Sequence, residues 1–442
     1  MKMRKTGVIA VLFLICGFLF PCGEGRTEQT ETRCLTLEET IREALINNWK
    51  LKAKDEKVQQ ATQVKNQARS GFLPTFGMTY GYSRLDDPRT MNLSGNTPID
   101  ISTRDNFEWA GTVKQPIFKG FAIVSSYELA KLGVDQAKTE VDLEKLNLAL
   151  RVKEAYFNVL GSDKALEVAR QATESLAAHV EEVRSFYEMD LVAVNDVLKA
   201  EVELGNADYE LVKVNNAARQ ARAALNTLMV RPIDAPVVLE DILVYSPERG
   251  DFEEYVHRAL DNRPEIKALD MGTLQVDQEI RLARSGMYPE IGLQYQYIKE
   301  GDTYDVSGSR FHEPNRWEAS AVLSWTFWEW GKTHYAVKEK RSIRKELEDL
   351  RKALEDDIRL EVKSALLELD QAEKNIPTAA KAVEQGEENL RASRERYRAQ
   401  VSTSTEVLDA QTLLTQAKLN YYRALYGHNL ARARIQRALG TY

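Results

Sequence analysis

Residues 317–328 read WEASAVLSWTFW, and apolar and polar side chains alternate along this stretch. Successive side chains of a β-strand point to opposite faces, so one face of a strand formed here would be apolar and aromatic. About ten such residues, with aromatic residues at both ends, are typical of a tilted strand in a transmembrane barrel. An amphipathic strand of a soluble sheet fits this stretch equally well. The odd-numbered face carries Trp317, Ala319, Ala321, Leu323, Trp325 and Phe327.

A second copy of this pattern, FEWAGTVKQPIF, lies 210 positions earlier at residues 107–118. Upstream of the two copies lie two further alternating runs, 74–82 and 289–297, which match each other at an offset of 215 positions. We therefore predict four strands, at about 74–84, 107–118, 289–298 and 317–328. Four strands are too few to close a barrel, and lipid does not tolerate open sheet edges, so a membrane-spanning form requires several chains to share one barrel. The other apolar faces carry Phe76, Met78, Tyr80, Tyr82, Phe107, Trp109, Val113, Ile117, Ile291, Leu293, Tyr295 and Tyr297.

The duplication extends to the helical patterns around the strands. A helix is predicted before each strand pair, over 35–68 and 252–284. After each pair a long helix and a return helix are predicted, at about 120–188 and 195–230 and again at about 331–398 and 404–439. At 1.5 Å per residue each long helix would form a rod of about 100 Å. The chain is thus divided into repeat 1 (26–231), an inter-repeat linker (232–251) and repeat 2 (252–442), each repeat having the order helix, β-hairpin, long helix, helix.

Within the second long helix, the spacing of Ile343, Leu347, Leu350 and Leu354 is that of a heptad seam. Pro377 is expected to interrupt and kink this helix. The first copy has Glu167 at the matching position. The two repeats are therefore not expected to be equivalent at mid-height.

The N-terminal segment has a basic start, an apolar run and small residues at Gly23 and Gly25. It predicts a secretory signal peptide over residues 1–25 rather than a retained anchor. Cys34 would be the only cysteine of the mature chain, so no intrachain disulfide is expected, and acylation of Cys22 is not expected after Pro21. No later segment is long and apolar enough for a transmembrane helix, so we expect any membrane crossing to be made by β-strands.

Composition and motifs give no support for catalysis or for nucleic-acid binding. The net charge is −7, and the chain has no Gly-rich phosphate loop and no metal-type cysteine pair. Methionine is sparse, with 8 residues. We therefore expect no enzyme activity, no cofactor, no bound metal and no nucleic-acid partner. The five histidines, scattered without ligand spacing, are His179, His257, His312, His334 and His428.

Several short motifs, in order and partly doubled, resemble those of the TolC-like outer-membrane efflux proteins over nearly the whole mature chain. The motifs are LTLEET at 35–40, NN at 47–48, QPIF at 115–118, LVAVNDV at 191–197, NRPE at 262–265 and VLDAQ at 407–411. The resemblance implies a mainly α-helical homotrimer with a 12-stranded β-barrel in the outer membrane and a long periplasmic α-helical barrel. It further implies a periplasmic membrane-fusion adaptor and an inner-membrane pump of RND, ABC or MFS type as partners, and a passive exit duct as the function.

The resemblance also places functional roles at the two turns between long and return helices. It implies aperture or gating roles for Glu406, Asp409, Asp196, Lys199, Tyr397 and Tyr187, and adaptor contacts for Leu191, Val192, Val401 and Ser402. Where the family often has glycine, the first turn has Met189-Asp190 and the second Ala399-Gln400. Ser402 stands where the family can carry an arginine, so the closing network is expected to differ.

The residue pattern alone leaves two interpretations of the acidic pair open. Glu406 and Asp409 are three apart and share one helix face, so a trimer would bring six carboxylates together, which is typical of a cation-selective constriction. Alternatively, Thr403 to Glu406 forms a capping box and Asp409 is a solvated residue. Core packing is a comparable alternative for Tyr397.

Three functions are consistent with these features. The favoured one is the exit duct of a tripartite efflux system, and an outer-membrane duct for type I protein secretion is the closest alternative. A soluble periplasmic coiled-coil scaffold is an alternative from a different class. The duplicated strands between the helices argue against this scaffold.

Overall fold

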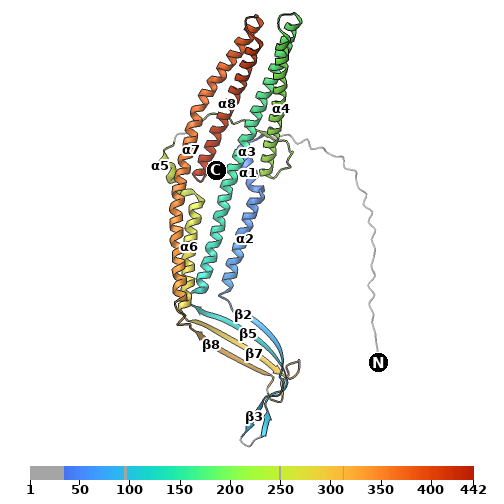
Figure 1. Ribbon diagram of the computed structural model, residues 1–442. Helices are drawn as coiled ribbons and strands as arrows, with labels where there is room; N and C mark the ends of the chain where they lie inside the picture. Colours follow the sequence, from blue (N-terminus) through green and yellow to red (C-terminus); the bar gives the residue numbers. More distant parts are fainter. Residues whose placement is uncertain (1–33, 94–96, 248–249, 312) are drawn as a thin grey trace, which may run out of the picture.

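The computed structural model describes residues 34–93, 97–247, 250–311 and 313–442, so the predicted signal peptide lies outside the described residues. The molecule is long and narrow, with a four-stranded sheet at one end and helices at the other (Figure 1). The mainly helical fold with one pair of long β-hairpins confirms the predicted fold class of a single chain.

Both halves of the chain contain the same order of elements, and the long helices α3 and α7 each have 67 residues. The first half has α1 (Leu37–Asn47), α2 (Trp49–Ser70), β2 (Thr75–Arg84), β5 (Asp105–Lys119), α3 (Ala122–Glu188) and α4 (Val194–Met229). The second half has α5 (Phe252–Asn262), α6 (Pro264–Arg284), β7 (Glu290–Gly301), β8 (Asn315–Ser324), α7 (Lys332–Arg398) and α8 (Ser404–Ala438). The smaller elements are β1 (Cys34–Leu35), β3 (Thr90–Leu93), β4 (Thr97–Asp100), β6 (Val238–Leu239) and the 3₁₀ turn η1 (Ser285–Met287).

The main sheet has the order β2-β5-β7-β8, and all of its neighbours are antiparallel. The central pair, β5 and β7, joins the two halves of the chain, and β2 and β8 are the edges. The long loop between β2 and β5 carries the small hairpin β3-β4, which Figure 1 shows at the end farthest from the helices.

The register of the four strands gathers the large apolar side chains on one face of the sheet. Tyr80 lies opposite Trp109, Tyr295 opposite Ala319, and Leu323 opposite Ile291. Cross-strand partners share a face of the sheet, so the faces predicted from the alternation coincide. This face is open to solvent in the single chain, with Phe76 at 77% and Leu323 at 63% exposure.

Two features of the predicted strands are wrong in detail. The strand expected over 317–328 ends at Ser324, because its pairing partner β7 begins at Glu290, directly opposite Ser324. Between Pro116 and Phe118 the register of β5 shifts by one residue, which is a β-bulge. As a result Phe118, rather than Ile117, lies opposite Ile291.

Each helix expected before a strand pair is broken into two. In the first, Asn48 has extended backbone angles and its side chain accepts a hydrogen bond from Lys50 N–H at 3.0 Å, so it ends α1 and caps α2. In the second, the break falls at Arg263, which precedes Pro264. Proline disfavours the helical conformation of the residue before it and is well suited to the first helical position, so α5 ends and α6 begins here.

The predicted linker packs on α3 at mid-height. Its strand β6 pairs in parallel with β1, next to the start of the first half. The Tyr156 hydroxyl of α3 lies 3.0 Å from the Leu35 carbonyl oxygen and 2.9 Å from that of Glu240, which fastens both strands to the rod. Within the described residues, no helix combines the length and apolarity needed to cross a bilayer.

The long helices behave only partly as the sequence predicts. α7 is continuous through Pro377, so the proline does not end the helix. Ile343 and Leu347 pack against the cluster between α6 and α7, and Leu354 packs in the next cluster. Leu350 is 48% exposed, so one member of the predicted seam has no close cover in a single chain.

Candidate functional site

The first turn between long and return helices lies at the end of the molecule farthest from the sheet (Figure 1). Asp190 has a φ of 59°, in the left-handed region. The amide of Asp190 donates to the Tyr187 carbonyl and that of Leu191 to the Phe186 carbonyl, both at 2.9 Å. This pair of bonds is the Schellman motif that ends many helices, usually with glycine in the left-handed position.

The second turn repeats this geometry. Gln400 also has a φ of 59°, and its amide donates to the Tyr397 carbonyl at 2.9 Å. The amide of Val401 donates to the Arg396 carbonyl at 3.0 Å. The absence of glycine from both turns therefore leaves their geometry intact, at a cost of roughly 1–2 kcal/mol for each left-handed non-glycine residue.

Glu406 combines a capping role with an exposed carboxylate. Its backbone N–H lies 3.4 Å from the Thr403 hydroxyl oxygen, which caps α8. Its carboxylate accepts a hydrogen bond from the Ser402 hydroxyl at 2.7 Å and lies 3.7 Å from an Arg396 guanidinium nitrogen. The carboxylate is therefore held at the start of α8, with the side chain 47% exposed. Of the two hydrogen bonds of a capping box, the one from the Glu406 amide to the Thr403 hydroxyl is formed.

Asp409 lies one turn further along α8 and is exposed. In the described part of the chain no hydrogen bond or ion pair of its side chain is found. The two carboxylates thus share the exposed face at the start of α8. The equivalent positions of α4 are Asp196, which is half-buried, and Lys199, which is exposed.

Tyr397 lies in a packed core, whereas Tyr187 is 44% exposed at the equivalent end of α3. The Tyr397 ring is 5.3 Å from that of His179 and 5.4 Å from that of Phe186. Burial first, and then the charges of Asp196 and Glu182, raise the pKa of Tyr397 to about 12. The Tyr397 hydroxyl is buried without a hydrogen-bond partner among the described residues.

A set of contacts between the two helix pairs was not predicted. Arg398 of α7 pairs with Glu182 of α3 at 2.6 Å, and His179 Nε2 lies 2.9 Å from the Ser404 hydroxyl of α8. Arg394 donates to the Ser175 hydroxyl. These partners are more than 200 positions apart, so no local pattern indicates them. The repeat offset of 210 positions is the one sequence signal that relates the end of α3 to the end of α7, and so could have suggested that the two helix pairs contact each other.

The residues expected to contact an adaptor occupy the two turns. Leu191 is 52% and Val401 is 65% exposed. Val192 is half-buried against the core between the helix pairs, and the Ser402 hydroxyl is bonded to Glu406. Of these four residues, Leu191 and Val401 are therefore the exposed apolar ones, and Met189 of the first turn, at 57% exposure, adds to them.

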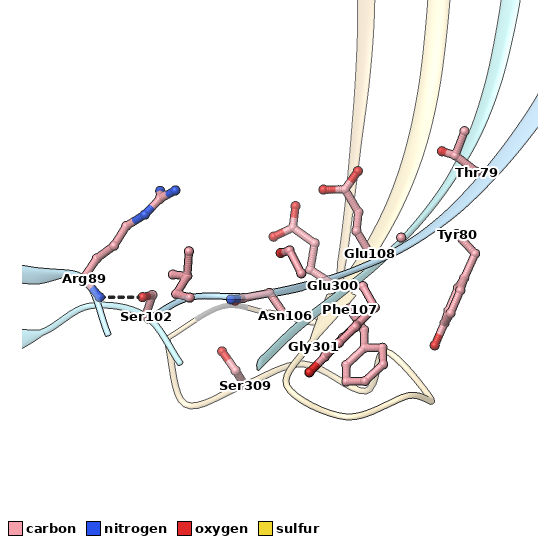
Figure 2. A pocket seen from close by; sticks show the side chains of 14 residues that line it. Thr79, Tyr80, Arg89, Ser102, Asn106, Phe107, Glu108, Glu300, Gly301 and Ser309 are labelled. Atoms are coloured by element: carbon pink, nitrogen blue, oxygen red, sulfur yellow. Dashed lines mark hydrogen bonds between the residues drawn. The ribbon is translucent and has the colours of Figure 1, made fainter. Parts of the chain in front are cut away.

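At the opposite end, the ends of β2, β5 and β7 and the adjoining loops line an open cavity of about 590 Å³. Glu108 and Glu300, which are directly opposite on β5 and β7, present their carboxylates side by side there (Figure 2). Arg316 pairs with Glu300 at 2.6 Å. At the rim, the Arg89 amide donates to the Ser102 hydroxyl at 2.9 Å.

The aromatic residues predicted to face lipid lie on the apolar face or just beyond it. Tyr295 and Trp317 stack with ring centroids 6.3 Å apart. The Tyr80 hydroxyl donates to the Tyr304 carbonyl at 2.6 Å. Trp109 is half-buried on the same face, and Trp325 and Phe327, beyond the end of β8, are 55% and 79% exposed. In the described residues no group of three or more His, Cys, Asp or Glu side chains could hold a metal ion.

A sheet with one exposed apolar face, continued by helices of 67 residues that end in paired turns, defines the class of outer-membrane export channels. The family model described as outer membrane efflux protein matches residues 40–230 and 255–441. The chain therefore belongs to the outer membrane efflux protein family. It is an outer-membrane exit duct of an efflux system, with an extended periplasmic part.

Individual relatives agree with this assignment. The outer membrane protein TolC of Vibrio cholerae is 23% identical over 397 residues, which cover 86% of this chain and 85% of TolC. Among solved structures, the transmembrane channel CusC superposes with a TM-score of 0.79 at 17% identity, covering 92% of each chain. The outer membrane protein VceC of Vibrio cholerae gives 0.78 at 17% identity, covering 92% of this chain and 96% of VceC.

Proposed function

We propose that three copies of this chain form one duct, in which twelve strands close a β-barrel in the outer membrane and the helices form a barrel across the periplasm. The observation that carries this proposal is the sheet itself, which has four strands, two open edges and an exposed apolar face. Lipid offers no hydrogen-bond partners to an open edge, so the strands must find partners in other copies. Three copies of the four-stranded sheet supply the twelve strands that the resemblance implies.

The molecular mass of the mature protein in detergent tests this assembly. We expect a particle of three chains, each slightly smaller than the 50.2 kDa of the full sequence. Strand content measured on the same sample is the control for folding. A monodisperse monomer that retains its strands would contradict the shared barrel.

We further propose that the two turns form the periplasmic aperture. Three copies of Glu406 and Asp409 would place six carboxylates around the axis and concentrate cations there. Asp196, held near Tyr397, would stabilise the closed arrangement of the helix pairs, with Lys199 and Tyr187 at the same level. The support is that Glu406 and Asp409 are exposed on one face and that Asp196 acts electrostatically on Tyr397.

The partners that we propose are a periplasmic adaptor and an inner-membrane pump, because nothing in the described chain indicates an energy source of its own. The exposed apolar residues Leu191 and Val401 make the turns suitable for adaptor contact. The pump would be of the RND, ABC or MFS type. Cross-linking in cells followed by identification of the co-purified inner-membrane protein distinguishes these, and an ABC partner with a protein substrate would indicate type I secretion.

We infer that the duct is not an enzyme. The Ser404 hydroxyl and His179 Nε2 lie 2.9 Å apart, but the two residues are only 2% and 3% exposed, so this pair is closed to a substrate and is better explained as a packing contact. We expect the protein to conduct ions in planar bilayers without any added nucleotide or substrate. Conductance that depends on the turnover of a substrate would contradict the inference.

A further inference from the structure

The last part of the predicted strand 317–328 has no pairing partner among the described residues of its own chain. β8 ends at Ser324, which faces the first residue of β7. Beyond it, Trp325, Phe327 and Trp328 are 55%, 79% and 65% exposed. Among the described strands none pairs with residues 325–329. An exposed aromatic segment that continues an edge strand is a template for pairing with another chain.

The equivalent strand of the first half shows what such a segment does when a partner is present. β5 continues to Lys119, although its pairing with β2 stops at Lys114. Its last residues, 115–119, pair only with β7, the first strand of the other half. The end of β5 is therefore ordered by a strand from the neighbouring repeat rather than from its own.

The equivalence between β5 and β8 is supported by the backbone on the helix side. Gly120 and Phe121 have φ angles of 57° and 70°, and Trp330 and Gly331, 210 positions later, have 54° and 82°. The helices that follow also start 210 positions apart, at residues 122 and 332. Residues 325–329 therefore correspond to 115–119. β2 and β7 begin 215 positions apart, at residues 75 and 290.

We propose that β2 of a second copy pairs with β8 in the register that β7 adopts on β5. This inference rests on the proposed shared barrel and adds its strand register. Val113 of β5 lies opposite Tyr295 of β7. The equivalent residues, 210 positions after Val113 and 215 positions before Tyr295, are Leu323 and Tyr80, so we expect Leu323 to lie opposite Tyr80 of the partner subunit. In the same way, Trp325 lies opposite Met78 of the partner subunit, and residues 325–328 become the end of the strand.

Three physical features agree with this register. β8 and β2 run in opposite directions across the sheet, as antiparallel pairing requires. Leu323 and Tyr80 are both on the exposed apolar face, so the apolar face continues across the junction. A slip by one residue would turn the whole aromatic set of one strand toward the polar face, which makes the register specific.

The equivalence also predicts where the pairing ends. The β-bulge at Ile117 corresponds to Phe327, so we expect Phe327 to be the unpaired residue of a bulge. At Gly120 an added Cβ would lie 2.4 Å from the Ser285 carbonyl oxygen. Trp330 occupies the equivalent position and has a side chain, so this close approach cannot be repeated there. The pairing between copies must therefore end before Trp330.

Paired cysteines on the polar face test this register. Lys114 and Gln294 lie opposite each other on β5 and β7. Their equivalents are Ser324 of β8 and Thr79 of β2, so we expect Ser324 to lie opposite Thr79 of the partner subunit. In a background with Cys34→Ser, the double variant Ser324→Cys and Thr79→Cys is treated with a short bifunctional thiol reagent that spans roughly 5 Å, the spacing of directly opposite residues. The matched controls combine Ser324→Cys with Gly77→Cys or Gly81→Cys, which are shifted by two residues. Single-cysteine variants report background linking.

We expect covalent dimers and trimers to form several-fold faster for the Thr79 pair than for either shifted pair. The native mass of each sample in detergent is measured before treatment. A trimer that links faster through Gly77 or Gly81, or that does not link at all, overturns the register but leaves the shared barrel standing. A folded monomer overturns both.

Amide hydrogen exchange of the unmodified protein provides a second test that no substitution can disturb. In the trimer we expect the amides of residues 325–328 that point toward β2 of the partner subunit to exchange several-fold more slowly than in an unfolded peptide of the same sequence, with little protection at Phe327. Rapid exchange throughout this segment in an intact trimer overturns the proposed strand.

Discussion

The two long helices, α3 and α7, have the same length and end in the same turn, yet they differ in how they are packed. Twenty of the 67 residues of α3 are buried, against nine of α7. α3 packs against α1, α2, α4, α6 and α8, whereas α7 packs against α5, α6 and α8. One duplicated sequence unit has thus become a central helix in one position and a lateral helix in the other.

This difference shows that the repeat determines the backbone, whereas the position within the folded chain determines which side chains are buried. Phe157 of α3 is 4% exposed, and its equivalent 210 positions later, Leu367 of α7, is 57% exposed. In the proposed trimer, the open side of α7 is a surface that a second copy can cover. Comparing equivalent positions therefore tests both the repeat and the assembly.

The largest effect is expected from truncating this pair. Phe157→Ala removes a buried ring from the cluster around Tyr156 and should cost about 3–5 kcal/mol of stability. Leu367→Ala should change the stability of the folded chain by less than about 0.5 kcal/mol, because the residue is exposed. Thermal unfolding in detergent compares the two.

The same pair distinguishes a free α7 surface from one covered by another copy. If Leu367→Ala lowers the fraction of trimer at low protein concentration while the unfolding of the chain is unchanged, the open side of α7 lies in the interface. Equal destabilisation by both substitutions would contradict the difference in packing between the helices.

The next largest effect concerns the sheet, where the two halves should behave alike. Val113 and Leu323 are equivalent and both lie on the apolar face. Replacing either by Arg places a charge in the apolar band, at a cost of roughly 2–4 kcal/mol per chain near the midplane. Ser324→Arg, on the polar face, is the control and should be much milder. The yield of folded protein in the outer membrane measures the effect, and a result as severe for Ser324→Arg would show that the faces are wrongly assigned.

The third prediction is that equivalent positions at the two turns have different effects on the channel. Glu406→Ala with Asp409→Ala should leave the protein folded, with at most about 1 kcal/mol lost from the cap of α8. Cation preference and block by trivalent ions from the periplasmic side should both fall. Asp196→Ala, at the position equivalent to Glu406, should instead raise the open probability. Single-channel recording distinguishes these outcomes, and unchanged selectivity in the double variant would leave Glu406 as a capping residue only.

The smallest effect is a pH dependence at the contact between the helix pairs. Burial lowers the pKa of His179 below its ordinary 6.5, with Glu182 raising it and Arg394 lowering it further. The ring also faces Ser404 of α8 and Tyr397 of α7. The unfolded chain binds a proton more readily than the folded chain, so the stability from this contact is present above about pH 6.5 and is lost as the pH falls.

We therefore expect the unfolding temperature to fall modestly between about pH 7 and pH 5 through this group. His179→Gln keeps a polar side chain that does not titrate, so this variant should show a smaller fall than the unmodified protein. An identical pH profile for both proteins would show that His179 does not contribute.

Much of the fold could be predicted from the sequence because the relevant signals are local or repeated. Alternation fixed the face of Tyr80 and Tyr295, and the 210-residue offset gave both long helices. The end of β8 at Ser324 does not follow from the alternation, because a strand also needs a partner, and no strand of the described residues pairs with residues 325–328. The breaks at Asn48 and Pro264 depend on single residues that a helical pattern does not exclude.

The candidate site could be predicted only in part. Glu406 and Asp409 were identified by spacing on one helix face together with the family resemblance. The contacts of Arg398 with Glu182 and of His179 with Ser404 depend on how two distant helix pairs pack, and no pattern within either helix indicates them. The burial of Tyr397 was likewise undecided, since an aromatic residue near a turn suits a core and a pore equally well.

The pairing of β5 with β7 has a consequence for how the chain folds. Val113 and Tyr295 are adjacent in the sheet but about 180 positions apart in the sequence, so the membrane sheet cannot form until the chain has emerged as far as β8, which ends at Ser324. α3 and α4 are consecutive and precede β7, so this helix pair can form earlier, because folding slows as contacts become more distant in sequence. We expect the first helix pair to form before the sheet, so that the apolar strands β2 and β5 wait exposed for their partners and are the most aggregation-prone part of the folding chain.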